Sequence, residues 1–133
     1  MVKNIISGLF SSKIDLGLLI LRVVFSISML THGWGKISKV FQGDFSFGNP
    51  IGIGAPATLI LTSIGEFIAP ILIILGVYVR LSALSTVLVM LGAIFAVHIA
   101  AGDPFGDYEL ALLYATGFLT LFISGGGKYS LKI

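Results

Sequence analysis

The sequence contains no cysteine and very little charge. Without cysteine, this chain has no disulfide bonds, no thiolate metal ligands and no thiol redox chemistry of its own. Only 11% of its residues are Asp, Glu, Lys or Arg, whereas soluble domains have about 25%. The net charge of +2 is small and the basic residues are scattered, which gives no signature of nucleic-acid binding. With 56% hydrophobic residues, the composition is typical of a chain that uses lipid as its solvent.

Long apolar runs predict an all-α integral membrane protein. An α-helix rises about 1.5 Å per residue, so about 20 apolar residues cross a hydrocarbon core of about 30 Å. We expect a single membrane domain over residues 1–133, folded as a four-helix transmembrane bundle. Its spans are expected at about residues 16–36, 56–79, 81–101 and 107–124.

The segments outside these spans are short. The glycine-rich segment 37–55 contains three phenylalanines, so we expect it to lie in the membrane interface or to fold over the bundle mouth as a lid or rim. Residues 1–15 fit either an interfacial helical turn or a frayed end. Arg22 interrupts the first apolar run and no small-residue cleavage site follows it, so we expect a retained span rather than a cleaved signal peptide.

The basic residues outside the spans predict the orientation in the membrane. Four spans place one group of them on the same side, namely Lys3, Lys13, Arg80, Lys128 and Lys132. The opposite side carries two lysines together with three aspartates. Because positively charged segments stay in the cytoplasm, we expect a multi-pass protein of the cytoplasmic membrane with both termini cytoplasmic.

Ionisable side chains within the predicted spans mark the candidate site. A charge at mid-bilayer costs about 2.5–3.5 kcal/mol on insertion scales, so such residues need partners or a function. Beside them, Gly33 would let a ligand or another backbone approach closely. We expect a polar pocket that opens to the outer side, with Glu66 at its floor. The candidate pocket residues are Arg22, His32, Gly33, Lys36, Glu66, His98 and Glu109.

Several of these residues also have a structural interpretation. Arg22 and Glu66 could form an ion pair that fixes the bundle geometry. Lys36 could extend to the lipid head groups, and Glu109 could serve only as an anion at a helix N-terminus. His98 lies on roughly the opposite side of its helix from a stripe of small residues, which argues against an inward orientation.

Two features of the predicted spans concern helix packing. Pro70 removes the backbone donor for the carbonyl of Glu66 and predicts a kink there. The stripe of small residues in the third span predicts close helix approach. Its members are Ser82, Ser85, Gly92, Ala93 and Ala96.

The same residues can be compared with the needs of cofactors. Two histidines on different helices could ligate a haem, but the sequence has no CxxCH motif and does not favour haem. Nothing has the ExxH or HxxxH spacing of a metal site, so we expect no metal. A quinone needs an apolar slot, a His or Lys donor and a carboxylate that relays protons, and the chain has all three. A small carrier would use the same groups.

Five segments together resemble the DoxX family of small four-helix membrane proteins. They are Arg22 with THGWGK at 31–36, SIGEFIAPILIILGVYVR at 63–80, AVHI at 96–99, YELALLY at 108–114 and GGGKYSL at 125–131. The resemblance covers about residues 16–131. It implies an association with respiratory-chain or redox chemistry, since the namesakes are linked to a thiosulfate:quinone oxidoreductase and other relatives to membrane complexes that handle thiol and oxidative stress. The seven candidate residues occupy the matching polar positions.

The leading hypothesis is a quinone-interacting, redox-associated membrane subunit. The chain lacks the extra domain and the cysteines of some redox relatives, so we do not expect it to be catalytic alone and assign no catalytic residue. Expected partners are the lipid bilayer, a quinone or another small hydrophobic ligand, and a redox protein or a second copy of the chain. Two alternatives stay open: a proton or solute carrier or channel that acts as an oligomer, and a non-catalytic scaffold for a membrane redox complex.

Overall fold

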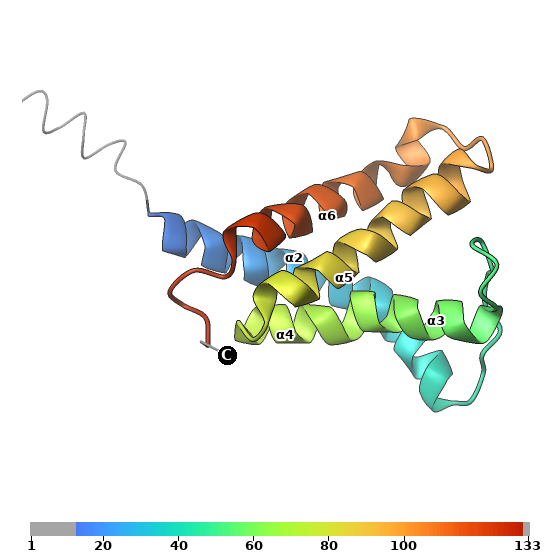
Figure 1. Cartoon of the computed structure of the whole chain (residues 1–133), viewed down its shortest axis with the longest axis horizontal. Coiled ribbons are helices and arrows are strands. Elements are labelled where there is room, and N and C mark those ends of the chain that lie inside the picture. Colours follow the sequence, from blue (N-terminus) through green and yellow to red (C-terminus); the bar gives the residue numbers. More distant parts are fainter. Residues whose placement is uncertain (1–12, 132–133) are drawn as a thin grey trace, which may run out of the picture.

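The computed structural model describes residues 13–131, and every regular element in that range is a helix (Figure 1). The elements are α2 (Ile14–Phe41), α3 (Ala55–Ser63), η1 (Ile64–Ile68), α4 (Ala69–Leu75), α5 (Val79–Gly92), η2 (Ala93–Ile99) and α6 (Phe105–Ser124). The two η segments are π-helical turns that join their neighbours into continuous helices, Ala55–Leu75 and Val79–Ile99. The all-α prediction is confirmed.

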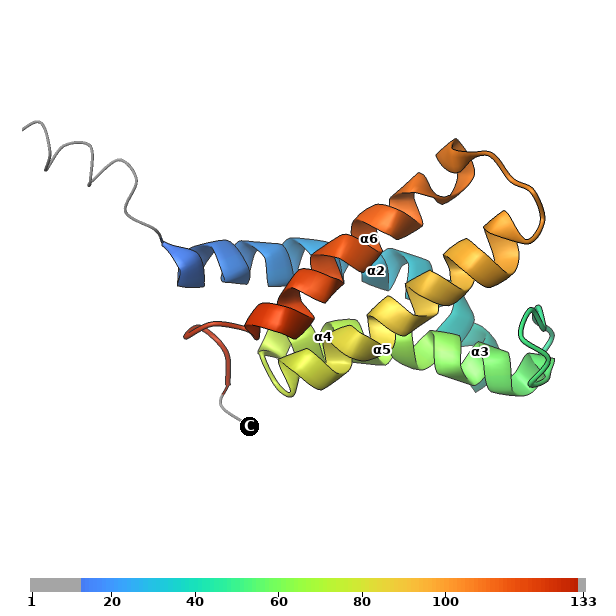
Figure 2. The same cartoon turned by 45° about the horizontal axis from the view of Figure 1, so that its top comes forward.

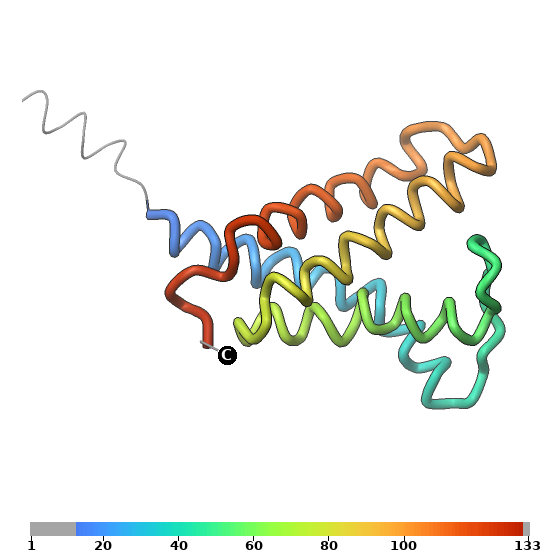
Figure 3. The backbone as a smooth tube through the Cα atoms, in the orientation of Figure 1, coloured from blue at the N-terminus to red at the C-terminus, as the bar shows by residue number. Residues whose placement is uncertain are grey.

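The chain runs back and forth along one axis, so its helices form two antiparallel hairpins (Figure 1, Figure 2). The hairpins approach each other at the end that holds residues 76–78 and 125–131, which we call the tail end. They diverge towards the end that holds residues 42–54 and 100–104, which we call the loop end (Figure 3). The candidate site described below lies at the loop end.

Three of the helices are long and apolar enough to cross a membrane: Ile14–Phe41, Ala55–Leu75 and Val79–Ile99. This confirms a membrane-spanning chain. Helix α6 is not among them, because it begins with Asp107 and Glu109 before its apolar stretch. It packs along α5 (Figure 1). Its role as a fourth span and the orientation of the termini stay predictions.

The first helix differs in length from the predicted span. It continues to Phe41 because the first strong breaker is Gly43, where φ is 74°. The connecting loop is therefore 42–54, shorter than the predicted 37–55. The second helix ends earlier than predicted, at Leu75, because Gly76 adopts a left-handed conformation with φ of 78°. Of the interfacial turn considered for residues 1–15, residues 1–12 lie outside the described range.

Helix α2 has the reverse of the polarity of a helix in a soluble protein. Its inner stripe is Arg22, Ser26, Met29, Gly33 and Ile37, all buried. Its outer face exposes large apolar side chains such as Ile20, Val24 and Ile27. This spacing of three and four residues is that of one helix face. Polar groups inside and apolar groups outside are what a lipid environment requires.

Aromatic and aliphatic side chains close the core between α2, α5 and α6. Phe118 is fully buried, and the ring of Phe25 meets it and Tyr114 edge-on, at centroid distances of 6.2 and 6.0 Å. Gly117 makes room for this arrangement, because a Cβ there would lie 2.0 Å from the Phe25 ring. This packing attaches α6 to the first helix through its middle.

Candidate functional site

A groove of about 440 Å³ lies at the loop end, between the helices Ala55–Leu75 and Val79–Ile99. Its walls are mainly apolar. Among the wall residues are Leu61, Ile64, Leu88, Val89, Ala93 and Val97. Each wall includes a π-helical turn, η1 on one side and η2 on the other. Ligand pockets of about 300–1,000 Å³ are usually lined in this way, with a few polar groups that orient the ligand.

The loop 42–54 forms the rim of this groove. Its residues Phe47, Pro50, Ile51 and Ile53 all line the groove. Upstream, Ser46 donates to Asp44 Oδ1 from its hydroxyl at 2.6 Å and its backbone N–H at 3.1 Å. These hydrogen bonds hold the pKa of Asp44 below its usual value. The predicted rim is thus an ordered turn that carries apolar side chains against the groove.

An ion pair between Lys36 and Glu66 supplies the charge in the groove. Lys36 Nζ lies 2.5 Å from Glu66 Oε2 and donates to the carbonyl of His32 at 3.3 Å. Glu66 is only 6% exposed. Its Oε2 atom is buried and is paired with the Lys36 ammonium. The pair is neutral overall and retains hydrogen-bonding capacity on the carboxylate.

Gly33 determines how closely α2 approaches this pair. A Cβ at Gly33 would lie 2.2 Å from the backbone oxygen of Glu66 and 2.9 Å from the nitrogen of Phe67. The two helices therefore cross backbone to backbone at this point. Of the two predicted uses of Gly33, approach of a ligand or of another backbone, the structure shows the second.

The π-helical turn η1 positions Glu66. The backbone N–H of Ala69 reaches the carbonyl of Ile64, five residues back. The next donor in that register would be Pro70, which has no N–H. The carbonyl of Gly65 is satisfied from the neighbouring helix instead, by the Thr86 hydroxyl at 2.6 Å. Where the sequence predicted a kink, the structure has a widened turn beside Pro70, and the carbonyl that takes an outside donor is that of Gly65.

The hydroxyl groups that line the groove already use their protons. Thr58 donates to the carbonyl of Gly54, Thr62 to that of Thr58 and Ser85 to that of Ser82, each at 2.7 Å. A hydroxyl that donates to the backbone can still accept a hydrogen bond through its lone pairs. These three side chains thus present acceptors to the groove.

Arg22 lies away from this groove, in the interior of the tail end. It is 1% exposed, and Nε donates to the carbonyl of Ile73 at 2.8 Å. Nη1 donates to the carbonyl of Gly126 at 2.7 Å and Nη2 to that of Tyr129 at 3.0 Å. The ion pair with Glu66 that the sequence allowed is not formed. Arg22 instead joins the end of α4 to the C-terminal segment.

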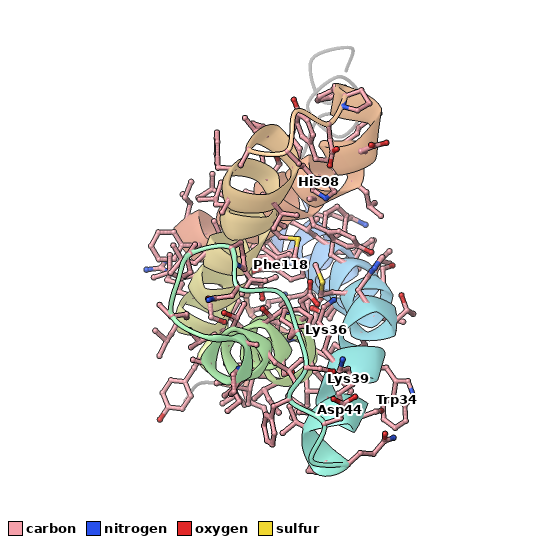
Figure 4. All side chains as sticks on the ribbon, turned by 90° about the vertical axis from the view of Figure 1, so that its right-hand side faces the viewer. Trp34, Lys36, Lys39, Asp44, His98 and Phe118 are labelled. Carbon is pink, nitrogen blue, oxygen red and sulfur yellow. The ribbon has the colours of Figure 1, made fainter. Side chains whose placement is uncertain are left out.

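His32, His98 and Glu109 do not line the groove. His32 is exposed, with its ring 5.5 Å from that of Tyr114. His98 Nδ1 lies 2.9 Å from Asp103 Oδ2, and Figure 4 shows His98 well apart from Lys36 when the loop end is viewed directly. Glu109 is exposed on α6. Of the seven predicted residues, the structure brings together only Gly33, Lys36 and Glu66.

Sequence reasoning missed several groove residues, although signals for them were present. The stripe of small residues predicted close helix packing, yet Ser85, Gly92 and Ala93 line the groove. Thr62 lies on the same side of its helix as Glu66, which is a helical-wheel signal. Nothing in the pattern identified Val97 or Leu88. Within residues 13–131, no three His, Asp or Glu side chains gather as a metal-binding group.

Comparison with known proteins identifies the family. The DoxX family model matches residues 17–99. An uncharacterised protein of Haemophilus influenzae is 34% identical over 84% of this chain and 84% of its own length. Inner membrane protein YqjF of Escherichia coli is 32% identical over 88% of this chain and 90% of its own length. The protein named "Putative oxidoreductase CatD" of Bacillus subtilis is 29% identical over 77% of each chain. No solved structure matches.

This chain is a helical membrane protein. It belongs to the DoxX family.

Proposed function

We propose that this protein binds a quinone in the groove and acts as a redox-associated subunit of the cell membrane. The observation that carries the proposal is the groove itself, which places one ion pair within apolar walls of about 440 Å³. Quinones combine a flat apolar ring with two polar oxygens. The walls from Leu88 to Val97 and the loop residues Phe47 and Ile51 would hold the ring and the start of its tail.

The ion pair supplies the polar contact that a quinone requires. An ammonium carries three N–H donors. In the described residues, Lys36 Nζ has two neighbouring acceptors, the His32 carbonyl and Glu66 Oε2. A third N–H is available to a quinone oxygen. Glu66 could take up or release a proton beside the same oxygen, as general acid–base chemistry requires.

The redox association rests on the relatives as well as the groove. One relative carries a name that describes an oxidoreductase. This chain has no cysteine, so we propose that electrons reach the groove from a partner protein or a second redox subunit. The protein on its own would bind the quinone without oxidising or reducing it.

The groove would open to the outer side of the membrane. The tail end carries the basic residues Arg80 and Lys128, and the loop end carries the acidic residues Asp44 and Asp103. The positive-inside rule then assigns the tail end to the cytoplasm. This assignment is the basis for proposing a multi-pass protein with both termini cytoplasmic.

A carrier or channel function finds less support. The charged groups of the groove lie at the loop end, whereas the tail end is closed by the bonds of Arg22 to the end of α4 and to the C-terminal segment. A scaffold without a ligand would have no need of an ion pair set in the wall of an apolar groove.

Quinone extraction from the purified protein tests the proposal. We expect liquid chromatography with mass spectrometry to detect about one quinone per chain. Ala93→Phe fills the groove and should remove it, whereas Ala57→Phe makes the same change on the exposed face of α3 and should not. A protein that carries no quinone and binds none when it is added would refute the proposal.

A further inference from the structure

A second hollow, of about 370 Å³, lies at the tail end, at the opposite end of the bundle from the groove. One wall of this tail hollow is the turn between α4 and α5 together with the first residues of α5. The other wall is the C-terminal segment, which returns beside this turn (Figure 1). The wall residues come from 76–81 and 125–131, and none of them lines the groove. A ligand of the tail hollow would therefore bind apart from the proposed quinone.

Two glycines fix the walls of the tail hollow. A Cβ at Gly76 would collide with the Cα of Ser130, so the turn and the C-terminal segment meet backbone to backbone. A Cβ at Gly125 would lie 3.2 Å from Arg80 Nε. The guanidinium of Arg80 thus lies against the bare backbone of Gly125, and both residues line the hollow.

Arg80 brings a positive charge into the tail hollow. The six acidic residues of the chain all lie within residues 13–131, and Asp15 is the only one of them at the tail end. The carboxylate of Asp15 accepts a hydrogen bond from the backbone N–H of Lys128 at 2.9 Å. Arg80 forms no ion pair with any residue of the described range. The charge of the hollow therefore favours an anion from outside the chain.

The tail hollow lies at the surface of the membrane. Two of the helices that can cross a membrane, Ala55–Leu75 and Val79–Ile99, meet here and are separated only by residues 76–78. The wall residues Leu81 and Leu131 are 68% and 57% exposed. An occupant of the hollow would therefore meet a cation beside exposed apolar side chains, at the depth of the lipid head groups.

We propose that the tail hollow binds the head group of an anionic phospholipid. The N–H donors of a guanidinium form a planar fork that matches the oxygens of a phosphate. The phenol of Tyr78, another wall residue, can donate a further hydrogen bond. The acyl chains would extend past Leu81 along the lipid-facing side of α5. Basic pockets beside membrane helices recognise anionic head groups through the same chemistry.

Competition between two lipids tests the proposal. The delipidated protein would be immobilised in detergent and equilibrated with equal amounts of dioleoyl phosphatidylglycerol and dioleoyl phosphatidylcholine. These lipids share their acyl chains and differ in the net charge of the head group. Liquid chromatography with mass spectrometry then gives the ratio of the bound lipids. We expect about fivefold more phosphatidylglycerol, because one basic residue at a membrane surface attracts an anionic lipid by about this factor.

Arg80→Met tests whether the arginine causes this preference. The ratio should fall below about twofold, since the positive charge of the hollow is lost. Arg80→Lys keeps the charge and should keep most of the preference. The matched control is Lys128→Met, which removes a positive charge from the same end but outside the hollow, and should leave at least about threefold. The lipid ratio on the wild-type protein decides the question if the Arg80 variants do not fold.

Inorganic phosphate distinguishes a lipid from a soluble phosphate as the ligand. A free phosphate can compete for Arg80 but has no acyl chain to contact Leu81. We therefore expect excess inorganic phosphate, at constant ionic strength, to leave phosphatidylglycerol bound. Displacement of the lipid would overturn the lipid assignment in favour of a soluble phosphate.

The remaining outcomes also separate this proposal from the quinone site. Equal binding of the two lipids, or an unchanged preference in a folded Arg80→Met variant, would overturn the lipid site. Neither result would bear on the groove, which lies at the other end of the bundle and shares no wall residue with the tail hollow. A failure to find quinone would likewise leave the lipid site standing.

Discussion

Arg22 and the Lys36–Glu66 pair are two buried charged groups at opposite ends of one bundle, and they are used differently. The guanidinium of Arg22 donates to four backbone carbonyls, two at the end of α4 and two in the C-terminal segment. The carboxylate of Glu66 is paired with Lys36 and lies against a groove. A charge inside a membrane protein is thus structural where it joins segments of the backbone, and a candidate for function where it lies against a groove.

At the tail end, the largest loss of stability is expected from a substitution of Arg22. Arg22→Met would remove the donor of the Gly126 and Tyr129 carbonyls and leave the Ile73 carbonyl with only the backbone N–H of Gly76. We expect a loss of about 3 kcal/mol or more in the free energy of unfolding, since each unpaired buried group costs about 1–3 kcal/mol. Denaturant unfolding in detergent, followed by circular dichroism, measures the change.

The matched control for this prediction is Arg80→Met at the same end of the bundle. Arg80 is exposed, and a surface substitution changes stability by about 0.5 kcal/mol or less. Equal effects of the two substitutions would show that Arg22 does not hold the tail end together.

At the loop end, a side chain added at Gly33 is expected to separate two closely packed backbones and to lower stability. Gly33→Ala would place a Cβ against the carbonyl of Glu66 and force α2 away. We expect a loss of about 1–3 kcal/mol, the usual cost of overpacking, together with weaker quinone binding because Glu66 moves. Thermal unfolding and ligand titration measure the two effects.

Gly35 provides the control, two residues along the same helix. No described atom lies within 4 Å of a Cβ built there, and alanine favours a helix over glycine by about 0.5–1 kcal/mol. Gly35→Ala should therefore be neutral or stabilising. A loss in Gly35→Ala as large as that in Gly33→Ala would contradict the close crossing of α2 and η1.

A substitution of Lys36 tests whether the ion pair of the groove contributes to ligand binding. Lys36→Met removes the side-chain donor of the groove and should weaken quinone binding about tenfold, by the loss of one hydrogen bond from a charged group. Lys39→Met changes a lysine one turn away that lies 3.7 Å from Asp44 instead, and should alter affinity less than twofold. Equilibrium dialysis measures the quinone affinity of both variants. Similar affinities for the two would remove Lys36 from the site.

The smallest effect is expected at His32. The sequence suggested that His32 contacts the ligand, but the structure places it outside the groove, beside Tyr114. His32→Ala should therefore change quinone affinity by less than about twofold. A tenfold loss in a well-folded variant would restore the original hypothesis and would require the ligand to lie along α2.

The helices and their inward stripe could be predicted because they follow from local sequence. Apolar runs of about 20 residues indicate spans, and the spacing from Arg22 to Gly33 indicates which side of α2 faces inward. The loop with its phenylalanines was predicted as a rim, and four of its side chains line the groove. The beginning of α6 was less clear, since Asp107 and Glu109 reduce its apolar character.

Among the candidate residues, the sequence alone determined that this protein places charge inside a membrane bundle, and that Gly33 lies at a close approach. Only the tertiary structure decided which partner each charge takes. The acceptors of Arg22 lie up to 107 positions away in the chain and are backbone carbonyls. Every residue has a carbonyl, so no side-chain pattern marks them. Lys36 and Glu66 meet because Gly33 lets two helices cross closely, and that relation exists only after the bundle has formed.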